Sequence, residues 1–167
     1  MATTASTVFG TSTALTITLA SLATSSTLLV GRNGTAVDIS GITTIPIDIL
    51  LGGSIMTGTT PTTAKIIEVW AAASENGTAY SGTVPATDAG LTMVAETKGL
   101  LRLVASMATN ATSNTAYTFA PVSLASLYGG ILPRKFNVFV THSTGVNLNS
   151  TAGNQFISYT PINFQSA

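Results

Sequence analysis

The stretch Thr13-Ala14-Leu15-Thr16-Ile17-Thr18-Leu19 alternates between apolar and polar side chains from Leu15 onward. Such alternation is typical of a β-strand with one buried face, because successive side chains of a strand point to opposite sides. The pattern predicts that Leu15, Ile17 and Leu19 enter a core while Thr16 and Thr18 face outward.

Similar runs rich in threonine and valine recur along the chain and predict further strands. They cover residues 27–31, 35–40, 46–57, 64–73, 98–108, 115–119, 136–142 and 155–164. Glycine- and asparagine-rich turn signals separate these runs. About eight short strands with turns at fairly regular spacing predict an all-β chain, built as an antiparallel sandwich or barrel.

Three connections are specific enough to predict one by one. The segment 58–63 lies between two apolar runs and predicts a hairpin. The dipeptide Asn33-Gly34 suits a two-residue type I′ turn, whose central residues both need positive φ. Residues 121–128 predict one short helical turn, which Pro121 begins and Gly129 ends.

Two longer segments leave choices open. The composition of residues 98–107 would tolerate a helix, but Leu101, Leu103 and Ala105 alternate with their neighbours, so a strand is the preferred prediction. The connection 74–96 is long and polar, and we expect either a surface excursion or a crossing between sheets.

Charge is sparse in this chain and confined to its middle. Only 12 of the 167 residues are charged, six basic and six acidic, and none lies before Arg32 or after Lys135. An ordinary soluble domain is about a quarter charged, and a net charge away from zero resists association. We therefore expect much of the outer surface to be packed against copies of the chain or against a larger assembly.

The length is close to the commonest domain size, and a 45% hydrophobic content supplies a core without disulfides, which a chain lacking cysteine cannot form. We predict one domain over residues 13–167, preceded over residues 1–12 by an extended arm or a frayed terminus. Met1 leads directly into Ala, Thr and Ser, which favours synthesis in the cytoplasm without export. No apolar run approaches the roughly 18 residues of a membrane-spanning helix.

Catalytic and metal-binding patterns are weak. His142 is the sole histidine, no Gly-x-Ser-x-Gly motif accompanies it, and we expect a turn residue bonded to backbone. One histidine without cysteine cannot make a zinc site. The acids are expected on solvated faces or as turn caps rather than as catalytic pairs. Those considered are Asp38 with Asp48, Glu68 with Glu75, and Asp88. We predict no enzyme, no cofactor and no metal.

Motifs for charged or glycan partners are also weak. Six scattered cations and zero net charge disfavour nucleic-acid binding, and no glycine loop has the spacing that cradles phosphate. The adjacent pair Arg134-Lys135 is expected at a solvated edge or against an acidic patch of a partner. Four Asn-x-Ser/Thr matches are attributed to the abundance of threonine. They begin at Asn33, Asn76, Asn110 and Asn149.

The aromatic side chains are expected in the core or at an interface, with the core as the default at strand spacing. They are Trp70, Tyr80, Tyr117, Tyr128, Phe136, Phe139, Phe156, Tyr159 and Phe164. Strands rich in threonine and poor in lysine lack the usual protection against edge pairing. Such edges suit a protein that is paired or covered in an assembly.

Several blocks of sequence in the C-terminal two-thirds form an ordered series. The first are Gly53-Ser54-Ile55-Met56-Thr57-Gly58-Thr59, Thr62-Thr63-Ala64, Ile67-Glu68-Val69-Trp70 and Thr87-Asp88-Ala89. The next is Pro121-Val122-Ser123-Leu124-Ala125-Ser126-Leu127-Tyr128-Gly129-Gly130-Ile131-Leu132-Pro133-Arg134-Lys135-Phe136. The last are Val138-Phe139-Val140-Thr141-His142-Ser143-Thr144-Gly145-Val146-Asn147-Leu148-Asn149 and Ile157-Ser158-Tyr159. In order and spacing this series resembles small virion proteins of tailed bacteriophages.

The resemblance implies a capsid decoration, or cement, protein. The fold it implies is a β-sandwich of jelly-roll type that sits on the exterior of the capsid shell, commonly as a homotrimer. The implied partners are further copies of the chain and the phage major capsid protein, without nucleic acid, membrane or small-molecule substrate. No catalytic residues come with that family. Relatives carry other aromatics in place of Tyr128 and Phe136, which leaves their packing role intact.

In this hypothesis, copies associate about a threefold axis through apolar and Thr-rich strand faces, and residues 1–13 reach onto neighbouring capsid subunits. An alternative is a carbohydrate- or receptor-binding jelly-roll module of a phage tail or fibre, which predicts a surface aromatic such as Trp70 or Tyr80 beside Asn76. A third hypothesis, a hydrolase, requires His142 to be partly buried beside a carboxylate.

Overall fold

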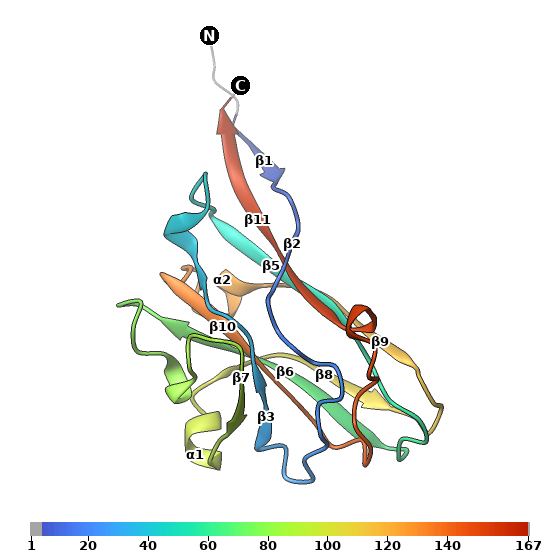
Figure 1. Ribbon diagram of the computed structural model, residues 1–167. Helices are drawn as coiled ribbons and strands as arrows, with labels where there is room; N and C mark the ends of the chain where they lie inside the picture. The colour runs from blue at the N-terminus through green and yellow to red at the C-terminus, as the bar shows by residue number, and fades with distance from the viewer. Residues whose placement is uncertain (1–4, 167) are drawn as a thin grey trace.

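Two antiparallel β-sheets pack face to face (Figure 1). The computed structural model describes residues 5–166. Sheet A contains, in spatial order, β1 (Ala5–Phe9), β11 (Phe156–Ser166), β5 (Asp48–Met56) and β9 (Ala116–Ser123), and the short β2 (Thr13–Ala14) also pairs with β11. Sheet B contains β7 (Ala89–Thr92), β3 (Val30–Asn33), β10 (Lys135–His142), β6 (Lys65–Ser74) and β8 (Arg102–Thr109), and β4 (Val37–Asp38) also pairs with β10. The prediction of an all-β antiparallel sandwich is confirmed.

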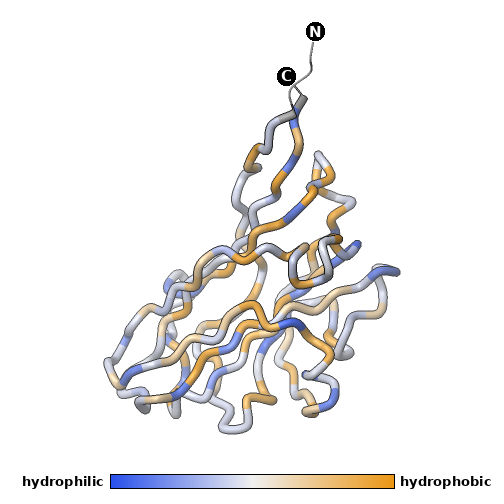
Figure 2. Tube along the Cα trace, turned by 180° about the vertical axis from the view of Figure 1, so that it is seen from behind, coloured by the Kyte–Doolittle hydropathy of each residue, from blue (hydrophilic) through white to orange (hydrophobic). Residues whose placement is uncertain are grey.

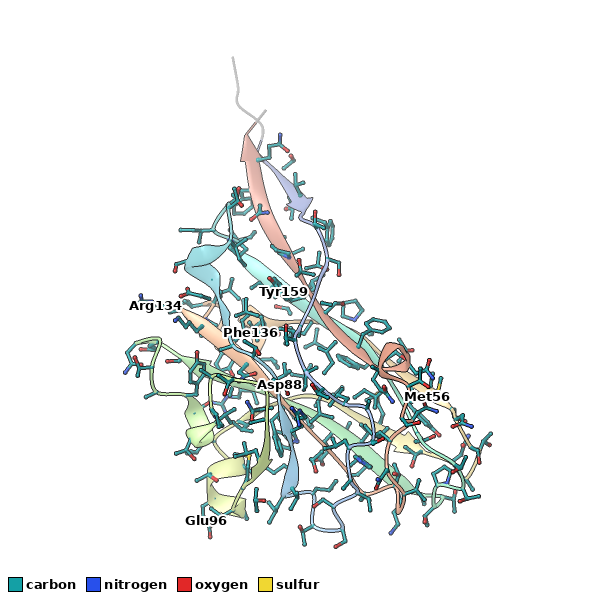
Figure 3. All side chains as sticks on the ribbon, in the orientation of Figure 1. Met56, Asp88, Glu96, Arg134, Phe136 and Tyr159 are labelled. Atoms are coloured by element: carbon teal, nitrogen blue, oxygen red, sulfur yellow. The ribbon has the colours of Figure 1, made fainter. Side chains whose placement is uncertain are left out.

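The main core lies between the two sheets. Every second side chain of the central strands enters it, as the pleat requires. Phe136 of β10 and Tyr159 of β11 meet across the interior edge to face, with ring centroids 5.9 Å apart (Figure 3). The fully buried aliphatic members include Ile49, Leu51, Ile55, Ile67, Val69, Val138, Val140 and Ile157.

A second, smaller core covers the outer face of sheet B. Phe139 and Ala72 point away from the main core and pack with Tyr80, Met93 and Leu101 of the long connection between β6 and β8. This connection contains the 3-10 turn η2 (Ser81–Thr83), the strand β7 and the helix α1 (Ala95–Lys98). Of the two possibilities for residues 74–96, the surface excursion is therefore correct, and it ends in the same sheet that it left.

A two-stranded ribbon projects from the sandwich and carries both ends of the described chain (Figure 1). It consists of β1 paired with the last five residues of β11, from Phe9 opposite Ile162 to Ala5 opposite Ser166. Strand β5 pairs with β11 only as far as Ile162, so the ribbon has no third strand beyond that point. Hydrophobic and hydrophilic residues alternate along the β11 strand of this ribbon (Figure 2). Much of the predicted arm is thus strand, and residues 1–4 lie outside the described part.

The opening stretch of the sequence is only partly a strand. Thr13 and Ala14 pair with β11, and the chain then runs without regular pairing to β3. Leu15 and Leu19 are nevertheless buried in the main core, and Ile17 packs against it. The alternation identified the buried side chains correctly, but it did not require a neighbouring strand along the whole stretch.

The predicted hairpin over residues 58–63 is wrong. Strand β5 belongs to sheet A and β6 to sheet B, so this connection crosses from one sheet to the other. Strand β5 pairs instead with β9 and β11, both distant in sequence. Two apolar strands joined by a turn-forming loop can lie in opposite layers of a sandwich as well as side by side, and local sequence does not distinguish the two.

The type I′ turn at Asn33-Gly34 is also wrong, because neither residue has positive φ. Asn33 ends β3, and its buried side-chain amide donates to the carbonyl oxygens of Gly34, Pro85 and Thr87. The residue that looked like a turn former therefore ties β3 to the connection before β7. Its buried amide group finds these acceptors in an otherwise exposed loop.

The helical turn is shorter than predicted and begins later. Strand β9 continues through Pro121 to Ser123, and only Leu124–Leu127 form the helix α2. The Ser123 hydroxyl caps α2 by accepting from the N–H of Ser126, and Gly129 ends it with a φ of 76°. Pro121 is tolerated in β9 because this strand lies at the edge of sheet A.

Two further differences concern short strands. Strands β1 and β7 were not predicted, since neither stretch has a distinct apolar pattern. Residues 102–107 do form a strand, but Leu103 is exposed because the register with β6 shifts between Val69 and Trp70. A bulge of this kind reverses which side chains face inward.

A third 3-10 turn, η3 (Ala152–Asn154), precedes β11, and η1 (Ile39–Gly41) follows β4. Asp38 caps η1 by accepting from the N–H of Ser40.

Candidate interaction surface

The outer face of sheet A follows directly from its strand register. Ser54 lies opposite both Phe156 and Thr118, and Gly52 lies opposite Ser158. Paired residues point to the same side of a sheet, so these five positions share a face. Their neighbours along the strands, such as Leu51, Ile55 and Ile157, point into the main core.

Charged side chains are almost absent from sheet A. Of the 12 in the chain, all but Asp48 lie in strands of sheet B or in segments attached to them. These are Arg32, Asp38, Lys65, Glu68, Glu75, Asp88, Glu96, Lys98, Arg102, Arg134 and Lys135. The sandwich therefore has one charged side and one uncharged side.

Asp48 does not make the face of sheet A acidic. It begins β5, is partly buried, and its Oδ1 atom accepts hydrogen bonds from the N–H groups of Ile49 and Ala125 at 2.7 and 3.0 Å. The carboxylate thus caps the start of α2 beside the strand. The centre of the face carries only neutral side chains.

Large aromatic side chains stand out from this uncharged face. Phe9, Phe156 and Phe164 are 67%, 50% and 63% exposed. Phe9 lies opposite Ile162, and Phe164 lies two residues further along β11, so both project on the same side as Phe156. Single exposed apolar residues are ordinary, but three aromatic rings on one neutral face make it the candidate interaction surface.

A trough of about 420 Å³ runs along the face. Small residues form its floor, chiefly Gly52, Ser158, Thr118 and Thr160, and Phe9 stands at one end with Phe156 at the other. The trough exists because glycine, serine and threonine occupy outward positions of three adjacent strands.

Ion pairs hold the charged side of the sandwich together. Within residues 5–166 they are Arg32 with Asp88, Lys98 with Glu68 at 2.6 Å, and Lys135 with Asp38 at 3.1 Å. Hydrogen bonds from Ser40 and then Lys135 hold the pKa of Asp38 below its usual 3.8. Burial raises the pKa of Asp88, but hydrogen bonds from Arg32 and Thr18 outweigh it and leave this pKa low as well.

The acids weighed as catalytic candidates thus have structural roles. Asp38 caps η1, Asp48 caps α2, Asp88 links β3 to Thr18, and Glu68 pairs with Lys98. They are not brought together: among residues 5–166, no three His, Cys, Asp or Glu side chains are placed to hold a metal ion.

His142 is fully buried at the end of β10. Its Nε2 lies 3.0 Å from the carbonyl oxygen of Leu22, and its Nδ1 lies 3.0 Å from the Thr144 hydroxyl. A carbonyl only accepts, so Nε2 carries the proton of the neutral ring. Burial lowers the pKa of His142 below 6.5, although the bond to Leu22 opposes this. Neither partner is a carboxylate, so the arrangement that the hydrolase hypothesis requires is not formed here.

The aromatic residues proposed for a glycan site are occupied within the fold. Tyr80 is buried in the second core. The Nε1 of Trp70 donates to Glu68 at 2.9 Å, and the Lys98 ammonium lies 4.8 Å from the centre of its ring. Asn76 uses its side-chain oxygen to accept from two N–H groups of its own turn.

Other predicted features also have places in the fold. Arg134 is exposed beside an apolar groove that also contains Ile45 and Ile131, and Lys135 pairs with Asp38. Burial raises the pKa of Tyr128 to about 12, and its hydroxyl donates to the carbonyl oxygen of Ala71.

The sequence contained a signal for the uncharged face. In β11 three of the outward positions, Phe156, Ile162 and Phe164, carry large apolar side chains, while Ser158 and Thr160 lie between them. Large apolar side chains at outward positions are typical of strands that are covered on both faces. Because aromatic residues at strand spacing usually lie in the core, Phe156 and Phe164 were predicted there, and the structure places both on the surface.

No helix within residues 5–166 has the length and hydropathy needed to cross a membrane. Comparisons with family models, with curated proteins and with solved structures found no match for this chain.

Proposed function

We propose that this chain is a structural virion protein that decorates and stabilises a bacteriophage capsid. It would be made in the host cytoplasm and added to the exterior of the shell, where copies associate as a homotrimer and bind the major capsid protein. Decoration stabilises a shell by mass action, because a protein that binds only the assembled lattice favours that lattice over its dissociated parts. Many repeated weak contacts make such binding strong.

The order of the strands supports a jelly roll. Numbered along the chain, the eight principal strands are β1, β3, β5, β6, β8, β9, β10 and β11. Sheet A then has the order first, eighth, third, sixth, and sheet B the order second, seventh, fourth, fifth. This is the order obtained when one long antiparallel ribbon folds over itself. Jelly rolls are frequent in viral capsid proteins and in lectins.

The observation that carries the proposal is the uncharged outer face of sheet A. A free soluble domain keeps charges on all its sides and avoids large apolar patches. Here the outer face of sheet A lacks charged side chains and presents three phenylalanine rings instead. A protein that spends its life packed in an assembly has no need of charge on the covered side.

Copy number in purified virions tests the proposal. Quantitative mass spectrometry of intact particles should find this chain at a fixed ratio to the major capsid protein, on the order of hundreds of copies per particle, as a repeated shell contact requires. A copy number of a few dozen or fewer would place the chain in the tail and favour the receptor-binding alternative. Its absence from the particle would refute both.

A further inference from the structure

We propose that the outer face of sheet A is the contact surface between copies of this chain, with Phe164 of one copy seated in the trough of the next. The inference rests on the proposed function, to which it adds the surface and the residues that form it. Three features support a second copy as the occupant: the neutral face, the distance between Phe164 and the trough of its own chain, and the two-stranded ribbon that lacks a core of its own.

Charge limits what can cover this face. A charged partner surface placed on it would lose hydration and would find no opposite charge among the outward side chains. A neutral surface meets no such penalty, and sheet A of another copy is one. Because the chain has six basic and six acidic residues, two copies also approach without net repulsion.

The trough cannot be filled by Phe164 of its own chain. Ser158 lies on the floor of the trough beside Gly52, and Phe164 lies six residues further along the same strand. At about 3.3 Å per residue, this separation is about 20 Å, so Phe164 cannot bend back into its own trough. A volume of about 420 Å³ is large enough to accept an aromatic ring.

The ribbon needs a neighbour for its own stability. Beyond Ile162 it has two strands and no core of its own. A two-stranded ribbon alone is marginally stable in water and requires a further strand or a packed surface. The face of a second copy supplies that surface to Phe9 and Phe164.

The contact joins two different patches, the ribbon of one copy and the trough of the next. Contacts of this head-to-tail type close into a ring when the rotation between copies allows it. The geometry is therefore compatible with the proposed trimer, in which each copy gives one ribbon and accepts another.

Sedimentation velocity of four purified variants tests the contact. Gly52→Val fills the trough, and the fold accepts it because the nearest atom to the new Cβ, Pro121 Cγ, is 3.7 Å away. Gly90→Val is the matched control, a strand glycine of sheet B with nothing within 4 Å of its Cβ position. Phe164→Ser removes the ring, and Leu100→Ser is its control at a similar exposure of 61% on the other side.

We expect Gly52→Val and Phe164→Ser each to weaken self-association by about tenfold or more, as loss of a central interface residue does, and both controls to behave as wild type. The double variant should be little weaker than either single one, since both changes act on one contact. Circular dichroism confirms that each variant is folded. Unchanged association of both face variants would overturn the inference.

Disulfide trapping gives a second, direct measurement, because the chain has no cysteine of its own. Thr118 lies at the same level as Phe156, with Ser54 between them. Phe156 and Phe164 are eight residues apart on β11, which is about 26 Å, so Thr118 lies far from Phe164 of its own chain. Thr7 lies opposite Phe164 in the ribbon, so a cysteine there keeps the ring. A mixture of Thr7→Cys and Thr118→Cys chains should yield a cross-linked dimer of the two, whereas Leu100→Cys with Thr118→Cys should not. Equal cross-linking in the two mixtures would contradict the contact.

Binding to shells separates this inference from the proposed function. If wild type and both face variants associate alike and still coat shells assembled from the major capsid protein of the same virus, the inference fails and decoration stands. The inference also fails if wild type is monomeric yet coats the shells. If wild type neither associates nor coats them, the proposed function fails.

Discussion

Gly31 illustrates how closely single residues fit between the strands of sheet B. A Cβ atom at this position would collide with the carbonyl oxygen of Val140 and would lie 2.8 Å from the ring of Phe139. Gly90, opposite Arg32 on the adjacent strand, has nothing within 4 Å. These two glycines on neighbouring strands therefore differ completely in the space available for a side chain.

We predict that Gly31→Ala lowers the free energy of unfolding by about 3 kcal/mol or more, because the clash is with backbone and a fully buried ring. Gly90→Ala should change it by less than about 1 kcal/mol, in the stabilising direction if the unfolded chain is stiffened. Urea unfolding of both variants makes the comparison. Equal effects would show that Gly31 does not approach β10 as described.

His142 makes stability depend on pH below neutrality. Because burial lowers its pKa below 6.5, the unfolded chain binds a proton more readily than the folded one. Well above pH 6.5 the ring is neutral in both states and contributes no pH dependence. As the pH falls from 6.5 through the lower folded pKa, this stability is progressively lost.

We predict that the wild-type free energy of unfolding falls between pH 7 and pH 5, with a slope that approaches about 1.4 kcal/mol per pH unit. His142→Gln should flatten this part of the curve, whatever its stability at pH 8. The shifted carboxyls of Asp38 and Asp88 act only near and below 3.8, in a separate window. Parallel curves for wild type and variant would rule out His142 as the cause.

At the scale of elements, the four-residue helix α1 is too short to be stable by itself. It is held by Lys98, whose ammonium donates to Glu68 and to the carbonyl oxygen of Leu28 and lies over the ring of Trp70. The Lys98 and Glu68 side chains are only 12% and 13% exposed. One cation thus attaches the surface excursion to β6.

We predict that Lys98→Met destabilises the protein by about 2 kcal/mol, because it leaves the Glu68 carboxylate nearly buried without its partner. Adding Glu68→Gln to Lys98→Met should recover part of the loss. Chemical denaturation of the two single variants and the double variant forms the required cycle. Strictly additive losses would mean that the pair is not coupled.

At the scale of the whole molecule, the separation of charge between the two sheets has a measurable consequence. Salt screens contacts between exposed charges and leaves neutral apolar contacts almost unaffected. An interface built on sheet A should therefore depend little on ionic strength.

We predict that the dissociation constant for self-association changes by less than about threefold between about 0.02 and 0.5 M sodium chloride. Sedimentation equilibrium at the two concentrations measures it. A steep weakening with salt would indicate that the charged side of the sandwich, with Arg102 and Lys65 on exposed strand positions, makes the contact instead.

The sequence alone determined the class of the fold and the identity of most buried residues. Alternation along β5, β6, β10 and β11 depends on the pleat of each strand, which is a local property. The lack of charge in the first 31 and last 32 residues was also visible there, together with its implication of a covered surface. Leu15 and Leu19 were placed in the core correctly even though their stretch is mostly unpaired.

Only the tertiary structure decided which sheet each strand joins. The segment between β5 and β6 looked like a hairpin and is a crossing, because strand pairing depends on contacts between residues far apart in sequence. That assignment in turn places 11 charges on one side of the sandwich and Phe9, Phe156 and Phe164 on the other. A list of residues contains the charges, but their separation into two faces arises only when distant strands are brought together.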